Sequence, residues 1–526
     1  MTAAIAGKQR RVTIIGAGPG GLATAMLLAA QGLKVTVLDR LDRVGGRTST
    51  LEHDGFRFDM GPTFFLYPQI LREIFSACGL RLEDEVDMIR LDPQYHLIFE
   101  EGGDLRATPD VARMQAEIAK VSPGDAERFP AFMADNRKKF SRFAPILQKP
   151  FGSLMDYLSP TLLKAGPLVR PWASVDSDLR RFFSDERIRL AFSFQSKYLG
   201  MSPFQCPSLF TILSYLEYDY GVFHPRGGCG AVSRGMARAA ERLGAEIRLN
   251  EPVEEILFEG RRAKGVRTTE GTYESDALVV NADFADAITR LVPERLRRKY
   301  TDKKVASKKY SCSTFMMYLG IEGRYDDLEH HTIFLSDDYQ NNLAQIEKRF
   351  EVPTNPSVYV QNAGVTDPTL APDGCSTLYV LAPVSHQNEK IDWSVHAEPF
   401  RRRVLEQMAK FGLGDVEERI RFEKVLTPVG WQQDMHIYKG ATFNLAHNLT
   451  QMLHMRPNNR FEEFEGVYLT GGGTHPGSGL PVIYESSRIS ARLLLEDLGL
   501  EVGWPDPSKQ PLEPPLPFAG LTPAGS

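Results

Sequence analysis

The fold class is decided by VTIIGAGPGG, residues 12–21 of the chain. Its first four residues are apolar or β-branched, as is typical of a buried parallel strand. The glycines that follow match the G-x-G-x-x-G pattern, and residues 22–32 have the alanine and leucine content of a helix ended by glycine. A strand, a glycine turn and a helix in this order predict an α/β fold that starts with a Rossmann-type nucleotide-binding unit.

The glycine turn supplies several of the expected contacts to a dinucleotide. Gly16 permits the tight turn, Gly18 lets the backbone approach a pyrophosphate, and Gly21 allows the helix to pack closely on the strand. Pro19 and Gly20 complete the turn at the start of the helix, whose free N–H groups face the phosphates. All five residues are therefore predicted to bind the cofactor.

An acidic residue lies at the spacing that this fold requires. Residues 35–38 are typical of a second strand, and Asp39 follows directly. A carboxylate at this place accepts hydrogen bonds from a ribose diol and repels a 2′-phosphate, which argues against NADP. Gly228 and Gly230 do not begin a second fingerprint, so no separate NAD(P)H site is expected.

The composition is that of a globular chain and excludes several classes of protein. Of the 526 residues, 42% are hydrophobic and 25% charged, which excludes whole-chain disorder, collagen and coiled coil. A net charge of −5 gives no electrostatic footprint for nucleic acid. The five cysteines form no C-x-x-C pair, which fits a reducing cytosolic compartment. The uncharged stretch 12–33 contains Pro19 and five glycines, which argue against a membrane span or a signal peptide.

A second glycine-rich loop lies near the end of the chain. Residues 466–481 read GVYLTGGGTHPGSGLP, a short buried strand followed by a glycine loop, and residues 482–498 have helical periodicity. This run closely resembles the C-terminal flavin motif of bacterial phytoene and diapophytoene desaturases, which are FAD-dependent enzymes of the amine oxidase superfamily. The resemblance covers most of the chain and stops beyond Leu500.

The resemblance implies FAD as the cofactor and identifies further residues that would contact it. GGR at residues 45–47 and GPT at residues 61–63 match the family's second cofactor-contacting segment, in which an arginine lies along the pyrophosphate. The alternative for Arg47 is a surface charge after a turn. The cofactor-binding residues implied in this way, besides the first turn and Asp39, are Gly45, Gly46, Arg47, Gly61, Pro62, Thr63, Val253, Asn281, Gly472, Gly473, Pro481 and Val482.

The same resemblance implies a discontinuous domain organisation. We expect an α/β architecture: a Rossmann-type FAD-binding domain of the glutathione-reductase-like flavoprotein fold, with an inserted α+β substrate domain and a helical lid. The FAD-binding domain is expected from residues 1–100, 220–300 and 455–500, and the substrate-binding domain from residues 101–219 and 301–454.

Two further segments have a distinctive composition. Residues 144–172 mix apolar residues with Lys149, Lys164 and Arg170, which suits a lid that lies in a membrane interface with its cations at the headgroups. The alternative is a lid that simply covers the substrate tunnel. Residues 501–526 form a proline-rich tail that we expect to be disordered or extended. The aromatic residues that could line the tunnel are Phe182, Phe183, Phe192, Phe194 and Tyr198.

The chemistry that the resemblance implies needs few polar groups. A hydride would leave an allylic carbon for the flavin and a proton would leave the next carbon, while the protein positions the substrate and excludes water. His475, in the second glycine loop, and Glu485 are the candidates for catalysis, although His475 could equally hold the backbone of its loop. His330 and His331 are adjacent and would point to opposite faces of a strand, so no metal site is expected.

The resemblance also implies partners, and it leaves alternatives open. A long hydrophobic isoprenoid would be the substrate, quinone or dioxygen would accept the electrons, and the protein would be cytoplasmic and peripherally associated with the cytoplasmic membrane. The alternatives are a related carotenoid-modifying terminal oxidase, isomerase or saturase, a flavin amine or porphyrinogen oxidase, and a flavin-fold escort protein without catalysis. An escort protein would usually lose the glycines and the acid of the nucleotide site, and both are present here.

Overall fold

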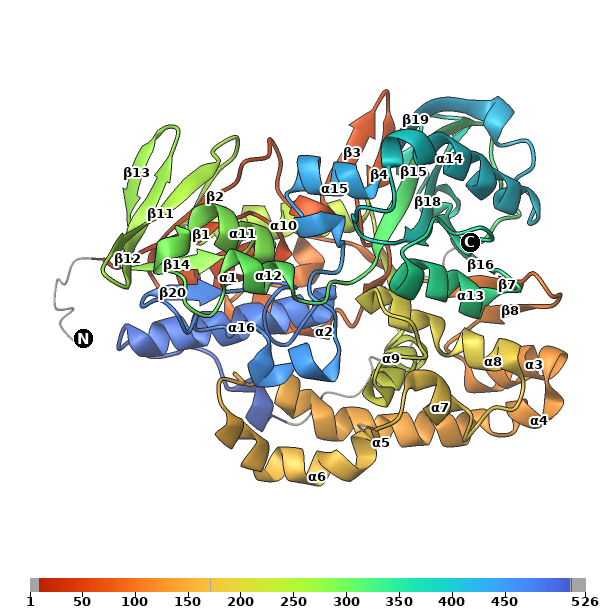
Figure 1. The fold of residues 1–526 in the computed structure, drawn as a ribbon, viewed down its shortest axis with the longest axis horizontal. Helices are drawn as coiled ribbons and strands as arrows, with labels where there is room; N and C mark the ends of the chain where they lie inside the picture. The colour runs from red at the N-terminus through yellow and green to blue at the C-terminus, as the bar shows by residue number, and fades with distance from the viewer. Residues whose placement is uncertain (1–8, 171, 511, 513–526) are drawn as a thin grey trace.

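The computed structural model describes residues 9–170, 172–510 and 512, and its first layer is a five-stranded parallel sheet (Figure 1). The strand order is β10-β2-β1-β14-β20. The strands are β1 (Arg11–Ile15), β2 (Lys34–Leu38), β10 (Glu246–Arg248), β14 (Ala277–Val280) and β20 (Val467–Leu469). They come from widely separated parts of the chain. The predicted α/β class is confirmed.

This parallel sheet is covered on both faces, which explains why its central strands are apolar throughout. Val12 and Ile14 pack on one side with three helices, and Ile15 packs on the other side with a small sheet and a helix. The helices of the first side are α1 (Pro19–Ala30), α10 (Cys229–Arg242) and α16 (Leu480–Asp497). The second side holds β11 (Val253–Glu259), β12 (Arg262–Thr268), β13 (Gly271–Glu274) and α11 (Phe284–Leu291).

A second, seven-stranded sheet lies beside the first layer, on the right in Figure 1, with the order β19-β15-β18-β17-β16-β7-β8. Its strands are β7 (Tyr95–Phe99), β8 (Asp104–Ala107), β15 (Ser313–Glu322), β16 (His331–Leu335), β17 (Val358–Gln361), β18 (Cys375–Val384) and β19 (Ile420–Leu426). The expected domain boundary at residue 100 would cut the β7–β8 hairpin. The structure instead places β7 in this second sheet, because it pairs with β16 as well as with β8.

Short strands connect the two layers. The hairpin of β3 (Thr50–His53) and β4 (Phe56–Asp59) packs against the second sheet through Phe56, Phe58 and Tyr379. A three-stranded sheet in the order β5-β9-β6 consists of β5 (Phe65–Leu66), β6 (Met88–Arg90) and β9 (Val222–Pro225). These strands bring residues 60–64, which follow β4, to the junction of the layers.

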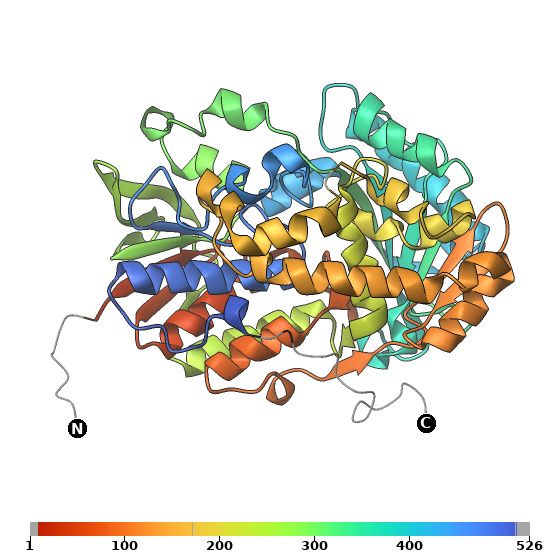
Figure 2. The same ribbon diagram turned by 90° about the horizontal axis from the view of Figure 1, so that it is seen from below.

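Helices cover the lower side of the molecule in the view of Figure 1, and Figure 2 shows them from below with α5 running across the face. They include α3 (Val111–Val121), α4 (Pro123–Ala126), α5 (Phe129–Leu147), α6 (Pro160–Val169), α7 (Val175–Leu179), α8 (Glu186–Ala191) and α9 (Ile212–Tyr220). The remaining helices are α2 (Gln69–Ala77), α12 (Asp302–Ala306), α13 (Tyr339–Ala344), α14 (Trp393–Ala409) and α15 (Pro428–Met435). Within the described residues, no helix combines the length and apolar character that crossing a bilayer requires.

The first part of the tail packs on the body of the protein. Trp504 is buried, and its carbonyl oxygen accepts a hydrogen bond from the Arg492 guanidinium of α16 at 3.1 Å. The Gly503 N–H donates to the Gln31 side chain at 3.2 Å. Of the two expected states, disordered or extended, residues 501–510 take a largely extended path against α1 and α16, while residues 511 and 513–526 lie outside the described residues.

Candidate active site

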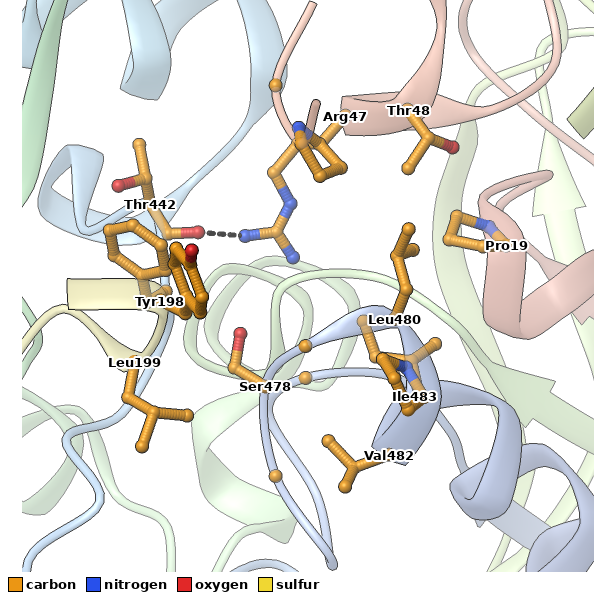
Figure 3. A pocket seen from close by; sticks show the side chains of 18 of the residues that line it. Pro19, Arg47, Thr48, Tyr198, Leu199, Thr442, Ser478, Leu480, Val482 and Ile483 are labelled. Atoms are coloured by element: carbon orange, nitrogen blue, oxygen red, sulfur yellow. Dashed lines mark hydrogen bonds between the residues drawn. The ribbon is translucent and has the colours of Figure 1, made fainter. Parts of the chain in front are cut away.

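A cavity of about 530 Å³ lies where the two layers meet, next to the carboxyl ends of β1, β2 and β14. Most of the predicted site residues line it, and Figure 3 shows several of them, among them Pro19, Arg47 and Val482. The predicted residues in the cavity wall are Gly16, Gly18, Pro19, Asp39, Gly46, Arg47, Gly61, Pro62, Thr63, Val253, Asn281, Gly472, Pro481, Val482 and Glu485. Gly20, Gly21, Gly45, Gly473 and His475 lie outside the wall.

The glycine turn is packed so tightly that side chains cannot be accommodated. A Cβ on Gly16 would lie 2.3 Å from the carbonyl oxygen of Asn281, and the φ of Gly16 is +100°. A Cβ on Gly21 would lie 2.1 Å from the carbonyl oxygen of Gly16. Gly21 therefore supports cofactor binding although it does not line the cavity. It lets α1 approach the turn and direct its N-terminal N–H groups toward the cavity.

Asp39 is held at the end of β2 by the backbone around it. Its Oδ2 accepts a hydrogen bond from the Ala17 N–H at 2.6 Å, and its Oδ1 accepts one from the Leu41 N–H at 2.8 Å. Burial raises the pKa of Asp39, and these two backbone hydrogen bonds oppose that shift. The carboxylate is thus fixed at the cavity wall, where it can accept hydrogen bonds from a ribose diol.

Arg47 is half-buried and faces the cavity from the segment that follows β2. Its guanidinium donates to the carbonyl oxygen of Thr442, the contact drawn as a dashed line in Figure 3. Burial lowers the pKa of Arg47, and the nearby carboxylate of Asp283 opposes that shift. Burial also raises the pKa of Asp283 to about 6. Asn444 lies between the two side chains, and its amide satisfies both when its nitrogen donates to Asp283 at 2.7 Å.

These features fit FAD at this end of the cavity. The N-terminus of α1 and the half-buried Arg47 provide positive potential for a pyrophosphate. Asp39 provides an acceptor for the ribose. The second glycine loop, which contributes Gly472 and Pro481 to the wall, offers backbone next to the same space.

The other end of the cavity is apolar and aromatic. Of the aromatic residues expected at the tunnel, Phe194 and Tyr198 line it. Phe182, Phe183 and Phe192 instead form a packed cluster around Phe132 and do not line the cavity. Other apolar residues of the wall are Phe64, Tyr67, Ile70, Phe140, Phe143, Leu147, Leu213, Leu216, Ile333, Leu335 and Tyr359.

The two candidates for catalysis are placed differently. Glu485 lines the cavity, but its carboxylate binds the Arg488 guanidinium, whose Nε donates to Oε2 at 2.9 Å. Burial raises the pKa of Glu485, and the charge of Arg488 opposes that shift. The His475 ring lies outside the wall with its Nε2 2.9 Å from the carbonyl oxygen of Lys149, and burial lowers its pKa to about 4. His475 thus holds backbone, and a catalytic role for either residue remains a prediction.

The paired histidines are arranged differently from the expectation. The ring centroids of His330 and His331 are only 4.4 Å apart, so the two rings do not point to opposite faces. The reason is that β16 begins at His331, and His330 lies outside the regular strand. Among the residues that the structure describes, no group of His, Cys, Asp or Glu side chains is arranged to hold a metal ion.

Comparisons with known proteins agree with this geometry. The family of flavin containing amine oxidoreductases matches residues 19–495. The chain belongs to this family. It is an FAD-dependent oxidoreductase of the phytoene and diapophytoene desaturase type, as the second glycine loop predicts.

The relatives and the solved structures define the family membership further. The chain is 44% identical to a 4,4′-diapophytoene desaturase (4,4′-diapolycopene-forming) from Methylomonas sp, over 92% of this chain and 95% of that protein. It is 39% identical to an all-trans-zeta-carotene desaturase from Myxococcus xanthus, over 97% and 98% of the two chains. A structure of putrescine oxidase with bound putrescine superposes with a TM-score of 0.60 at 18% identity, covering 94% of this chain and 99% of that chain, which shows the shared fold.

Sequence reasoning missed one buried acid of this flavoenzyme. Glu217 on α9 is fully buried, and its Oε2 accepts hydrogen bonds from Gln195 at 2.9 Å and from the Tyr95 hydroxyl at 3.1 Å. Burial raises the pKa of Glu217 to about 7. The sequence signal that could have found Glu217 is an acidic residue directly after Leu216, in a segment of mainly apolar and aromatic residues.

Replacing Gly21 should abolish FAD binding. Gly21→Ala places a Cβ against the Gly16 carbonyl oxygen and pushes α1 away from the turn, so we expect purified protein without flavin absorbance. Gly124→Ala is the matched control, since a Cβ there meets nothing within 4 Å. Flavin absorbance per protein, together with the thermal unfolding midpoint, measures the effect. Normal flavin content in Gly21→Ala would contradict this account of the turn.

Replacing Glu217 should change how stability depends on pH. The folded pKa of about 7 lies above the ordinary value of 4.5, so the wild-type protein loses stability as pH rises through this window. The uncharged side chain of Glu217→Gln lacks this loss. We expect the free energy of unfolding of the variant, relative to wild type, to rise by on the order of 3 kcal/mol between these pH values.

Denaturant titrations across this pH range measure the difference. Glu241→Gln, at an exposed position on α10, is the control and should follow the wild-type curve. A constant difference between Glu217→Gln and wild type at every pH would show that Glu217 does not titrate with a raised pKa.

Proposed function

We propose that this flavoenzyme desaturates a linear polyisoprenoid, such as diapophytoene or phytoene, and extends its conjugated polyene. The observation that carries the proposal is the joining of a dinucleotide site to a long apolar and aromatic chamber in one cavity. A hydrocarbon has no hydrogen-bonding groups, so its binding depends on burial against such a wall. The printed activities of the relatives, desaturation of diapophytoene and of zeta-carotene, support the same substrate class.

The chain's own residues have a limited set of tasks in this reaction. Bound FAD would supply a hydride acceptor, that is, an acceptor for one proton together with two electrons. The aromatic wall around Phe64 and Tyr198 positions the polyene and excludes water. Aromatic faces also stabilise positive charge that develops on an allylic carbon. Arg47 and the turn at Gly16 would hold the pyrophosphate of the cofactor.

We propose in addition that the protein docks on a membrane surface through residues 154–172. Five of the ten large apolar side chains that are exposed in the described part of the chain lie in this short range. They belong to η3 (Leu154–Leu158), α6 and the segment after it, and Trp172 is 79% exposed. The five residues are Leu154, Met155, Leu158, Leu163 and Trp172. An exposed apolar cluster of this kind suits insertion into a headgroup region.

The charges of this region do not all match the expectation. Arg170 was expected to face lipid headgroups, but its guanidinium binds Asp135 at 2.7 Å and Asp178 at 2.6 Å. Because both acids hold it, Arg170 orders the segment rather than offering a free cation. The proposed contact with the membrane therefore rests on apolar side chains.

A reconstituted assay tests the desaturase function. FAD-loaded protein is mixed anaerobically with vesicles that contain diapophytoene or phytoene, and a quinone is then added; dioxygen replaces the quinone in a parallel sample. We expect new visible absorption bands at longer wavelength from one or both precursors, because each added double bond lengthens the polyene. Conversion of only a preformed carotenoid would favour a terminal oxidase, isomerase or saturase. Peroxide production from an amine, with both precursors unchanged, would favour an amine oxidase.

Removing the exposed apolar side chains should weaken membrane binding. The triple variant Leu154→Ser, Met155→Ser and Leu158→Ser should sediment less with vesicles of phosphatidylcholine and phosphatidylglycerol, because it buries less apolar area in the bilayer. Activity in detergent should persist. The control carries Val395→Ser and Leu449→Ser, two exposed apolar positions elsewhere. Equal sedimentation of the triple variant and wild type would argue against this docking surface.

A further inference from the structure

A chain of hydrogen bonds leads from the cavity into the second sheet. The Thr63 hydroxyl lies 2.7 Å from the Tyr359 hydroxyl, and the Tyr359 hydroxyl lies 2.8 Å from Nδ1 of His331. Thr63 and Tyr359 line the cavity, while His331 is fully buried behind them. His331 also stacks on Phe64 with ring centroids 4.0 Å apart, which fixes the plane of its ring. The cavity wall thus contains a hydroxyl that is directly connected to an imidazole.

Behind His331 lies a cluster of buried imidazoles and carboxyls. The ring centroid of His330 is 4.4 Å from that of His331 and 4.7 Å from that of His224. Nε2 of His224 lies 3.4 Å from Oδ2 of Asp367, which also accepts a hydrogen bond from the Gly227 N–H at 2.6 Å. Nδ1 of His330 lies 2.8 Å from the Thr366 hydroxyl and its Nε2 lies 3.2 Å from the Gln361 side-chain nitrogen, so its contacts with His331 and His224 are ring contacts.

Two of the rings in this cluster are neutral before the substrate reacts. Burial lowers the pKa of His330 and of His331 well below the usual value, so both rings are neutral at neutral pH. The acidic groups that face the cluster are Asp59 from β4 and Asp367. The other titratable groups around it are His224 from β9, Tyr359 from β17 and Cys229 from α10.

Asp367 is an ionised group of this cluster, and it lies against His224 rather than His331. Hydrogen bonds from His224, Gly227 and Thr369 hold the pKa of Asp367 well below its usual range, which keeps it ionised.

We propose that Tyr359 and His331 receive the proton that the substrate loses. This inference rests on the proposed desaturase function. As the C–H bond next to the cationic carbon breaks, its electron pair becomes the new C=C bond. The proton passes to the Tyr359 oxygen while the proton of Tyr359 moves to Nδ1 of His331. The substrate has then lost one hydride to the bound flavin and one proton to the protein, so atoms and electrons balance.

The position of Tyr359 and His331 explains why the reaction needs a proton acceptor at this place. The apolar end of the cavity excludes water, and a proton released there has few acceptors. Tyr359 places a hydroxyl in that wall, and His331 gives the hydroxyl a basic partner. Glu217 is the competing acceptor, since it is buried near Tyr198, another residue of the wall.

The test compares Tyr359→Phe and His331→Gln with a matched control, Tyr318→Phe. The Tyr318 hydroxyl is buried in the same sheet and donates to the Met60 carbonyl oxygen, but it does not line the cavity. The measured quantity is the rate of anaerobic flavin reduction by whichever precursor the wild-type protein desaturates. We expect Tyr359→Phe and His331→Gln to slow this step about 100-fold, because each removes part of the proton acceptor. The FAD content and the thermal unfolding midpoint of both variants should equal those of Tyr318→Phe.

The pH profile separates a relay from a structural role. His331 must be neutral to accept the proton, so the wild-type rate should be constant through neutral pH and fall only in acid, below the usual histidine pKa. His331→Gln should be slow at every pH and lack this acidic limb. Histidine side-chain NMR of the protein without substrate gives an independent readout: Tyr359→Phe should shift the His331 signals, and Tyr318→Phe should not.

Each failure has its own signature. The relay would be overturned if Tyr359→Phe reduced its flavin at the wild-type rate. It would also be overturned if Glu217→Gln were slow while His331→Gln kept the wild-type rate. Unchanged His331 signals in Tyr359→Phe would contradict the hydrogen bond on which it depends. If the wild-type protein reduces its flavin with neither precursor, the proposed desaturase function is wrong, and the relay falls with it.

Discussion

The contact between the first glycine turn and Asn281 is the constraint on which the active site depends. The Asn281 side chain donates to the carbonyl oxygen of Gly16 at 3.0 Å. The backbone carbonyl oxygen of Asn281 occupies the place that a Cβ on Gly16 would need. This contact joins the end of β1 to the end of β14. The position of α1, and with it the direction of the N–H groups offered to the cofactor, follows from that junction. Glycine at these positions is thus a condition of close approach, rather than a source of flexibility.

The second constraint is the burial of charge beside an apolar chamber. A compact polar group at the cofactor end consists of Arg47, Asp283 and Asn444. Their mutual contacts offset the free-energy cost of removing each of them from water. Polar groups behind the chamber, such as Glu217, are also held by hydrogen bonds. A cavity suited to a hydrocarbon is therefore surrounded by polar side chains that lie directly behind the residues of its wall.

The sequence predicted the parts of the protein that depend on local spacing. The turn at residues 16–21, Asp39 and the loop before α16 each lie within one strand–turn–helix unit, and most of their residues line the cavity. Long-range pairing was beyond such reasoning: β7 joins β16 across more than two hundred residues, and His224 meets His330 only because β9 and the second sheet pack together. Nor could composition show that Asp135 and Asp178 bind Arg170, or that Trp504 packs back onto α16.

The order of strands in the parallel sheet has a consequence for synthesis of the protein. β20 pairs with β14, and the loop that follows β20 contributes Gly472 and Pro481 to the cofactor wall. A nascent chain on the ribosome exposes one edge of the apolar strand β14 without a partner until residues 467–481 have emerged. The cofactor wall is therefore incomplete until these residues have emerged, and a product that ends before β20 presents an unpaired strand edge to chaperones and proteases.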